Sequence, residues 1–215
     1  MTSIRTESFA YDGGREVSIW MPNTPPEAIV YAGDGASIAQ WGAELETAGL
    51  PPTMIVGIHA MEYDDEMDRI REYSPGFAPD TFAAHEQFVM RDVRGWVKTE
   101  LGIDLPPERT AICGASASGE LALALGLRHP DVFGNVFCMS PGGGYQPPDN
   151  LPEKLPRFYF TAGLQEPWFA ENARRWATAL KSAGAEVLIT EREGDHGDPF
   201  WQQEFVSMVK WMLAD

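Results

Sequence analysis

Short apolar runs alternate with longer amphipathic segments along most of the 215-residue chain. The short runs are rich in β-branched and aromatic residues and are bounded by Gly, Pro and Asp, a pattern typical of strands. The predicted strands are 6–11, 15–21, 27–32, 53–59, 109–113, 134–140, 157–163 and 185–190. The sequence Asp12-Gly13-Gly14 joins the first two strands and indicates a hairpin.

The longer segments repeat their apolar residues with helical spacing. The predicted helices are 38–49, 81–101, 119–129, 167–184 and 198–213. Asp80 is expected to cap the helix 81–101 at its N-terminus. The polar stretch 60–79 is expected to be a loop, and a loop of this length is either a solvated connection or a lid over a binding site.

Strands that alternate with helices predict βαβ units and a mainly parallel sheet, with helices on both faces. The opening hairpin would add antiparallel strands at one edge. No repeat or linker divides the sequence, so residues 1–215 are expected to form a single α/β domain. Binding sites in such sheets lie at the carboxyl ends of the strands, so the residues that follow each strand are the candidates for function.

Composition excludes some partners. The formal net charge is −16 and no basic block is present, which argues against a nucleic-acid or anionic-membrane partner. Cys113 and Cys138 both lie in apolar strand-like runs and are interpreted as buried free thiols, with a disulfide as the less favoured alternative, and they make no metal site. No apolar run is long enough to span a bilayer, so a cytoplasmic protein is expected, although a sequence lacking its leader would look the same.

Ser116 follows the strand 109–113 within the sequence GASASG. A nucleophile elbow, in which a strained serine stands between a strand and a helix, needs small residues two positions before and after the serine. Gly114 satisfies the first position. At the second position Ser118 stands in place of glycine, and the elbow tolerates it because the serine side chain is small. If Ser118 were the nucleophile, the large side chain of Glu120 would stand two positions after it, where a small residue is needed. Ser116 is therefore the better candidate. The alternative is a turn of small residues that packs a helix on the sheet.

His196 lies between the last strand and the last helix, where a general base is expected. His59, at the end of a strand, is its best competitor. Glu166 follows the strand 157–163 and is the candidate acid that orients the base, and Asp195 or Asp198 are the alternatives. The chain order of serine, acid and histidine is the order found in α/β-hydrolases.

The sequence GDGAS follows the strand 27–32, at the position of a loop that supplies an oxyanion-hole amide. The backbone amides of Ala117 and of Ala36 or Gly35 are expected to form this hole. A simple turn is the alternative. Taken together, these residues predict a serine hydrolase with an α/β-hydrolase fold.

Several longer stretches resemble the esterases of the enterochelin-esterase-like group, which are related to esterase D and the antigen 85 mycolyltransferases. These stretches are REVSIWMP, GDG, PPTMIVGI, RIREYSP, ICGASASGELAL, LRHPDVFGNVFCMSPG, TAGLQEPWFAENA and GDHGDPFW. The resemblance implies that the nucleophile is Ser116, the base His196 and the acid Glu166, with an oxyanion amide at Ala36. Asp34 matches a residue that contacts substrate hydroxyls in the mycolyltransferases.

The chain departs from this family at three points. Ser118 stands where the family usually has glycine, and Gly197 and Asp198 stand where an aromatic residue often follows the histidine. Some relatives work with a serine–histidine dyad, so a dyad without Glu166 is the alternative to the predicted triad.

The predicted function is a serine carboxylester hydrolase that acts through an acyl-enzyme on a small to medium ester and needs no cofactor or metal. One alternative is acyl transfer to a hydroxyl with the same residues, and another is a non-catalytic binding protein of the same fold. Nucleotide binding is disfavoured, because GASASG lacks the glycine spacing and the lysine of a phosphate-binding loop. The oligomeric state is left open.

Five side chains are candidates for the substrate pocket beyond the catalytic residues. Besides Asp34, Arg69 would pair either with an anionic substrate or with a neighbouring acid. Tyr145, Trp168 and Trp201 follow strands and would either line an aromatic pocket or belong to the core.

Overall fold

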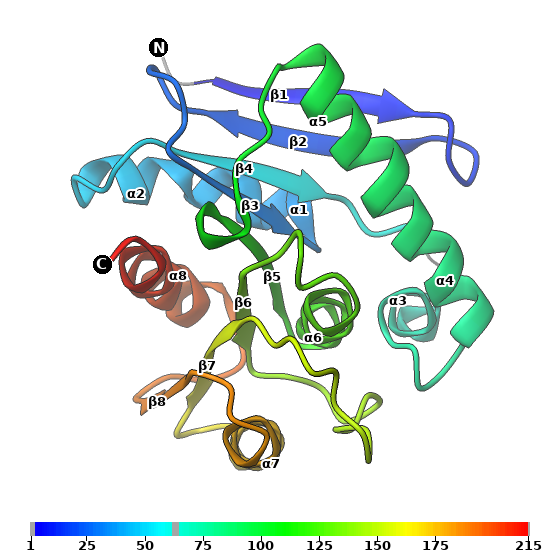
Figure 1. Cartoon of the computed structure of the whole chain (residues 1–215), viewed down its shortest axis with the longest axis vertical. Helices are drawn as coiled ribbons and strands as arrows, with labels where there is room; N and C mark the ends of the chain where they lie inside the picture. The colour runs from blue at the N-terminus through cyan, green and yellow to red at the C-terminus, as the bar shows by residue number, and fades with distance from the viewer. Residues whose placement is uncertain (1–2, 62–64, 215) are drawn as a thin grey trace.

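Within residues 3–61 and 65–214, which the computed structural model describes, eight strands form one sheet in the order β1-β2-β4-β3-β5-β6-β7-β8 (Figure 1). The strands are β1 (Ser3–Phe9), β2 (Arg15–Met21), β3 (Ala28–Ala32), β4 (Thr53–Ile58), β5 (Thr110–Ala115), β6 (Asn135–Met139), β7 (Arg157–Gly163) and β8 (Val187–Arg192). The pairs β1–β2 and β2–β4 are antiparallel, and all other neighbours are parallel. This arrangement confirms the predicted parallel sheet with an antiparallel hairpin at one edge.

Helices cover both faces of the sheet (Figure 1). They are α1 (Gly35–Ile38), α2 (Gly42–Thr47), α3 (Glu66–Tyr73), α4 (Pro79–Gln87), α5 (Arg94–Glu100), α6 (Ala117–Arg128), α7 (Pro167–Ser182) and α8 (Asp198–Leu213). Helices α3 to α7 pack on one face around a core that includes Phe82, Leu121 and Trp176, whereas α1, α2 and α8 pack on the other around Trp41 and Phe205. Both cysteines are buried and free, as predicted.

Three local predictions were wrong. The stretch 60–79 contains the helix α3, because the side chain of Asp65 caps it by accepting a hydrogen bond from Met67 N at 3.0 Å. The next helix begins at Pro79 rather than after a cap at Asp80, since proline has no N–H to leave unpaired in a first turn. The predicted helix 38–49 is instead two short helices joined by a 3-10 turn at 39–41.

A buried charge cluster anchors α3 to the body of the domain. Glu72 on α3 accepts a hydrogen bond from Arg15 Nη2 at 2.8 Å, and His85 Nδ1 lies 3.3 Å from the same carboxylate oxygen. All three residues are buried. Burial alone would raise the pKa of Glu72, but the contacts with His85 and Arg15 outweigh it and lower the pKa to about 2.

Glu72→Gln is expected to lower the free energy of unfolding by about 3 kcal/mol at neutral pH, because it leaves a buried arginine without its buried counter-charge. A carboxyl group whose pKa is lowered on folding stabilises the protein above its ordinary pKa of 4.5, and this contribution is lost as the pH falls towards 2. The difference between variant and wild type should therefore shrink over that range in urea titrations. The exposed Glu171 is the matched control, and an equal effect of Glu171→Gln would contradict the explanation.

Candidate active site

Ser116 stands between β5 and α6 in a strained backbone conformation, with φ of 57° and ψ of −119°. Its amide donates to Met139 O at 2.9 Å, and its carbonyl accepts from Gly119 N at 3.1 Å and from Gly142 N at 3.2 Å. Three hydrogen bonds thus hold the residue in a conformation that costs on the order of 1–3 kcal/mol. This is the geometry expected of a nucleophile elbow.

The neighbours of Ser116 explain why serine is accepted at position 118. A Cβ on Gly114 would lie 1.9 Å from Ser118 O, so the first flank must be glycine. Ser118 is fully buried, and its Oγ accepts from Ala115 N and donates to Ala115 O, both at 2.8 Å. The room for its side chain comes from Gly33, where a Cβ would lie only 2.7 Å from Ser118 Cβ. Ser118 therefore binds the last residue of β5 to the first turn of α6.

Ser118→Ala is expected to lower the free energy of unfolding by about 1–3 kcal/mol, because two buried backbone groups of Ala115 lose their partner while the Cβ packing stays. Thermal or urea unfolding measures the effect. The exposed Ser182 at the end of α7 gives the control Ser182→Ala, which should change stability by less than about 0.5 kcal/mol. Equal stability of Ser118→Ala and wild type would show that the hydroxyl does not support the elbow.

Glu166 and His196 are brought together by the carboxyl end of β7 and the loop after β8. His196 Nδ1 lies 2.6 Å from Glu166 Oε2. The other oxygen of Glu166 accepts from Gly163 N at 2.6 Å and from Ser140 Oγ at 2.5 Å. Glu166 is only 5% exposed, and burial alone would raise its pKa, but hydrogen bonds from His196, Ser140 and Gly163 together lower the pKa of this carboxyl group. The carboxylate is fixed in the position from which it orients the imidazole.

Glu166 is the acid whose contact with His196 the structure describes. Of the two aspartates proposed as alternatives, Asp195 is exposed, and the side chain of Asp198 lies outside the described part of the chain.

His196 is held by aromatic rings as well as by Glu166. The ring of Phe169 stacks on it with centroids 3.8 Å apart, and Trp201 meets it edge-on at 4.7 Å.

Ser116 and His196 line the same cavity, which has a volume of about 520 Å³. This volume suits a small to medium ligand. Among the described residues, no side chain is hydrogen-bonded to the Ser116 hydroxyl. Catalytic hydrogen bonds are often loose before substrate binds, so shared access to one cavity is the relevant observation here.

One wall of the cavity is a strip of three glycines, 142–144. A Cβ on Gly143 would lie 2.8 Å from the ring of Trp168, and one on Gly144 would lie 2.0 Å from the ring of Phe77. Both rings are about half exposed, at 55% and 51%, and both line the cavity. Side chains on the strip would displace these rings, so the glycines keep the wall thin and the aromatic rings close to it.

Glu120 is a cavity residue that the sequence analysis missed. It is 2% exposed, lies one turn after Ser116 on α6, and accepts a hydrogen bond from Gly144 N at 2.8 Å. Burial raises the pKa of its carboxyl group. Its position in the first turn of the helix that follows Ser116 was the available signal, but the sequence did not show that Gly144 would donate to it.

The proposed oxyanion amides occupy two helix starts. Ala117 begins α6 and lines the cavity, and the first amides of a helix have no acceptor within it. Gly35 begins α1, where a Cβ would lie 1.8 Å from the carbonyl carbon of Gly57, and it is buried, whereas Ala36 is exposed. Neither Gly35 nor Ala36 is among the described cavity-lining residues, and the oxyanion hole, with Ala117 and either of these residues, stays a prediction.

Asp34 and Arg69 form an ion pair beside the cavity, with Arg69 Nε 2.8 Å from Asp34 Oδ1 and a second contact between Nη2 and Oδ2. The Asp34 amide also donates to the hydroxyl of Tyr73 at 3.1 Å. Of the two predictions for Arg69, the structure contains the pairing with a neighbouring acid. Because Asp34 opposes the charge of Arg69, the arginine is a weak site for an anionic substrate.

The other predicted pocket residues have mixed positions. Trp168 lines the cavity. The ring of Tyr145 instead packs against the core residue Trp176, with ring centroids 5.1 Å apart. Trp201 donates its indole N–H to Ser140 Oγ at 2.9 Å, and Ser140 Oγ in turn donates to Glu166. Tyr145 and Trp201 are not among the described cavity-lining residues.

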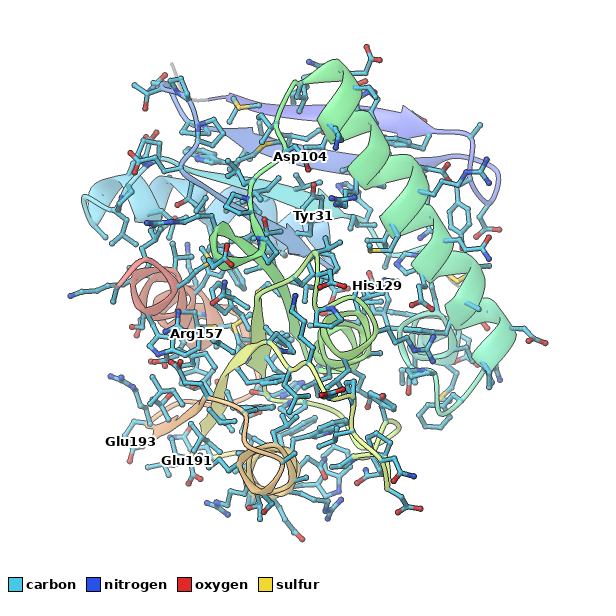
Figure 2. The ribbon with its side chains drawn as sticks, in the orientation of Figure 1. Tyr31, Asp104, His129, Arg157, Glu191 and Glu193 are labelled. Carbon is cyan, nitrogen blue, oxygen red and sulfur yellow. The ribbon has the colours of Figure 1, made fainter. Side chains whose placement is uncertain are left out.

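The competing histidines lie elsewhere. His59 is hydrogen-bonded to Ser18 Oγ at 2.8 Å, and His85 belongs to the buried cluster with Glu72. His129, labelled in Figure 2, lies at the opposite end of α6 from Ser116 and pairs with Glu86. None of them lines the cavity that contains Ser116, within the described residues.

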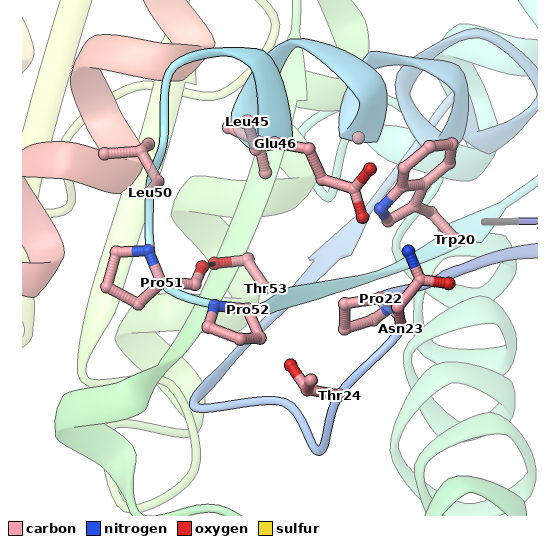
Figure 3. Close-up of a pocket in the computed structure, with 11 residues that line it drawn as sticks. Trp20, Pro22, Asn23, Thr24, Leu45, Glu46, Leu50, Pro51, Pro52 and Thr53 are labelled. Atoms are coloured by element: carbon pink, nitrogen blue, oxygen red, sulfur yellow. Dashed lines mark hydrogen bonds between the residues drawn. The ribbon is translucent and has the colours of Figure 1, made fainter. Parts of the chain in front are cut away.

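A second hollow, shown in Figure 3, lies between the loop after β2 and the segment that leads into β4. Its volume is about 190 Å³, and its wall includes Trp20, Leu45 and three prolines, with Glu46 as its charged member. This hollow contains no serine or histidine among its described lining residues. In residues 3–61 and 65–214 we also find no cluster of His, Cys, Asp and Glu that could hold a metal ion, and no helix capable of spanning a membrane.

The chain is similar to known esterases in its sequence pattern and in its fold. Residues 16–212 match the model of the family described as "Putative esterase". The fold is similar to that of enterochelin esterase from Shigella flexneri, with a TM-score of 0.81 and 19% identity over 97% of this chain and 57% of that chain. The chain thus spans less than three fifths of that esterase.

Two further solved structures are similar over most of both chains. A ferulic acid esterase from Anaeromyces mucronatus has a TM-score of 0.74 and 15% identity, and the match covers 97% of this chain and 90% of that one. An S-formylglutathione hydrolase from Staphylococcus aureus has a TM-score of 0.69 and 12% identity over 100% and 97% of the two chains. At these identities the likeness establishes the α/β-hydrolase fold. A sequence search of curated proteins found no match.

Proposed function

Because the chain belongs to this esterase family, we propose that it is a serine carboxylester hydrolase that acts through an acyl-enzyme on a small to medium ester. The observation that carries the proposal is the joint position of a strained Ser116 and a Glu166-bound His196 on the wall of one cavity. In nucleophilic catalysis an oriented imidazole activates a serine that the backbone holds exposed, whereas a binding protein needs neither feature.

In the proposed reaction Ser116 Oγ attacks the ester carbonyl while His196 Nε2 removes its proton. Glu166 holds Nδ1, which fixes the ring and stabilises the imidazolium that forms. The amide of Ala117, with that of Ala36 or Gly35, stabilises the oxyanion. His196 then gives its proton to the leaving alcohol, and it later activates the water that cleaves the acyl-enzyme.

The charges around the cavity favour uncharged substrates. Arg69 is paired with Asp34, so it presents no unopposed positive charge to a substrate. Glu120 is a buried acid and gives an anionic group no counter-charge. One structural neighbour is named as an esterase of ferulic acid, which is an aromatic acid. Trp168 and Phe77 support an ester with an aromatic group for this protein too, since aromatic rings pack well against each other.

The experiment that tests the proposal is product analysis with an ester panel in the presence of an acceptor alcohol. Acyl esters of 4-nitrophenol and of methanol, from acetyl to cinnamoyl, would be incubated with the protein and glycerol, and the products separated by mass. A free acid as the main product supports a hydrolase. A glyceryl ester as the main product would assign acyl transfer to the same residues, and no product above the uncatalysed rate would favour a non-catalytic binding protein.

A further inference from the structure

Ser140 is a second strained serine, at the carboxyl end of β6. Its φ is 45°, in the left-handed region where glycine is the favoured residue. It is fully buried, and its amide donates to Thr161 O at 2.8 Å. Strand β6 lies between β5, which carries the nucleophile, and β7, which leads to the acid. A serine that is conformationally disfavoured at this place needs a reason in its side chain.

The hydroxyl of Ser140 connects Trp201 to Glu166. Ser140 Oγ donates its one proton to Glu166 Oε1 at 2.5 Å and accepts from the indole N–H of Trp201 at 2.9 Å. Because the indole is a donor only, it directs the hydroxyl proton towards the carboxylate. Trp201 also touches the imidazole of His196 edge-on, so the chain of contacts begins and ends at the catalytic base.

We propose that Ser140 is a positioning residue of the acid–base pair, whose hydroxyl, oriented by Trp201, fixes Glu166 against His196. The inference rests on the proposed function, because it concerns how that site works. It assigns Ser140 and Trp201 a role that acts through Glu166 rather than through contact with substrate. The strained backbone of Ser140 is retained because glycine would remove the hydroxyl.

The expected direction of the pH effect follows from the charge on Glu166. Without the Ser140 hydroxyl the carboxylate has one donor fewer, holds the imidazolium more strongly, and keeps the base protonated to higher pH. The acid limb of the kcat/KM profile should therefore move to higher pH. Charged groups also lie around the pair: Arg69 and Glu120 in the cavity wall, the adjacent Asp195, and Glu204, which binds Thr161 beside Ser140 and pairs with Arg192. These groups are the same in every variant below.

The test compares Ser140→Gly and Ser140→Ala, which both lack the hydroxyl but differ in strain. Glycine relieves the positive φ and alanine does not. Both variants are expected to lose about 10- to 100-fold in kcat and to move the acid limb up by about half a pH unit. The Tm of Ser140→Gly should nevertheless equal or exceed that of Ser140→Ala. Trp201→Phe, which keeps a ring beside His196 but removes the N–H, should shift the acid limb in the same direction by a smaller amount.

Ser18→Ala is the control, because Ser18 also binds a histidine, His59, but outside the site. Its acid limb should coincide with that of the wild type. A Ser140→Gly variant with wild-type kcat and acid limb would overturn the inference, as would kcat losses that track the Tm of the two Ser140 variants. If the wild type has no activity that depends on Ser116, the proposed function itself fails. If the activity depends on Ser116 but not on Ser140, only the positioning role is wrong.

Discussion

Ser116→Ala is expected to lower kcat/KM on the best ester of the wild type by at least about 10⁴-fold. The hydroxyl oxygen is the atom that forms the acyl-enzyme, and a water molecule in its place is not held covalently in position to attack. The loss should appear in kcat rather than in KM, because the methyl group leaves the cavity wall intact. Steady-state kinetics on the same ester panel measure it.

Stability provides the control for this substitution. The alanine side chain of Ser116→Ala would occupy the same strained conformation as serine, so the free energy of unfolding should stay within about 0.5 kcal/mol of the wild type. Ser116→Gly should be inactive as well but more stable by about 1 kcal/mol or more, since glycine adopts the positive φ without strain. Activity in either variant comparable to the wild type would show that the nucleophile is elsewhere.

Glu166→Gln is expected to lower kcat by about 10²- to 10⁴-fold, the range that follows from loss of an orienting carboxylate in serine hydrolases. The amide keeps the size of the side chain but cannot stabilise the imidazolium, and its NH₂ group cannot accept the Nδ1 proton. The group that loses its partner is His196, so the defect should lie in kcat. Glu171→Gln, at an exposed position in the first turns of α7, is the matched control and should have wild-type kinetics.

The pH dependence of this substitution has a defined sign. The pKa of Glu166 is lowered in the folded protein, so its charge stabilises the fold above its ordinary pKa of 4.5 and this contribution is lost as the pH falls below that value. Glu166→Gln should therefore be less stable than the wild type at neutral pH, with the difference shrinking in acid. A dyad mechanism would instead leave kcat within about threefold of wild type, and Glu166 would then have only a structural role.

Most of the sheet was predictable because the inner strands were short apolar runs with clear boundaries. The two edge strands were predicted at 6–11 and 185–190 but lie at Ser3–Phe9 and Val187–Arg192, because they are more polar. The runs 15–21 and 157–163 have the predicted bounds, and the helix 198–213 also begins and ends as expected. The rule that sites lie at the carboxyl ends of strands then selected Ser116, Glu166 and His196. In the structure Ser116 and His196 line one cavity, and Glu166 is hydrogen-bonded to His196.

The features that were not predictable depend on contacts between distant segments. Helix α3 has a local cap in Asp65, but it was missed because the contact that buries it, Glu72 with Arg15, joins residues 57 positions apart. Ser140 follows β6 and was available to the strand-end rule, but its role depends on Trp201 and Glu166 meeting it from two other segments. Glu120 was weighed only as a poor neighbour for a nucleophile at Ser118, since nothing in the sequence indicated that Gly144 would donate to it.

The most direct test of the account is labelling with a fluorophosphonate probe, followed by peptide mass spectrometry, on the wild type and on Ser116→Ala. A fluorophosphonate forms a covalent bond only with a serine that an adjacent base activates. We predict one modified peptide, carrying the probe on Ser116, that is absent from the variant. Absence of labelling in the wild type, or labelling that persists in Ser116→Ala, would contradict the proposed nucleophile.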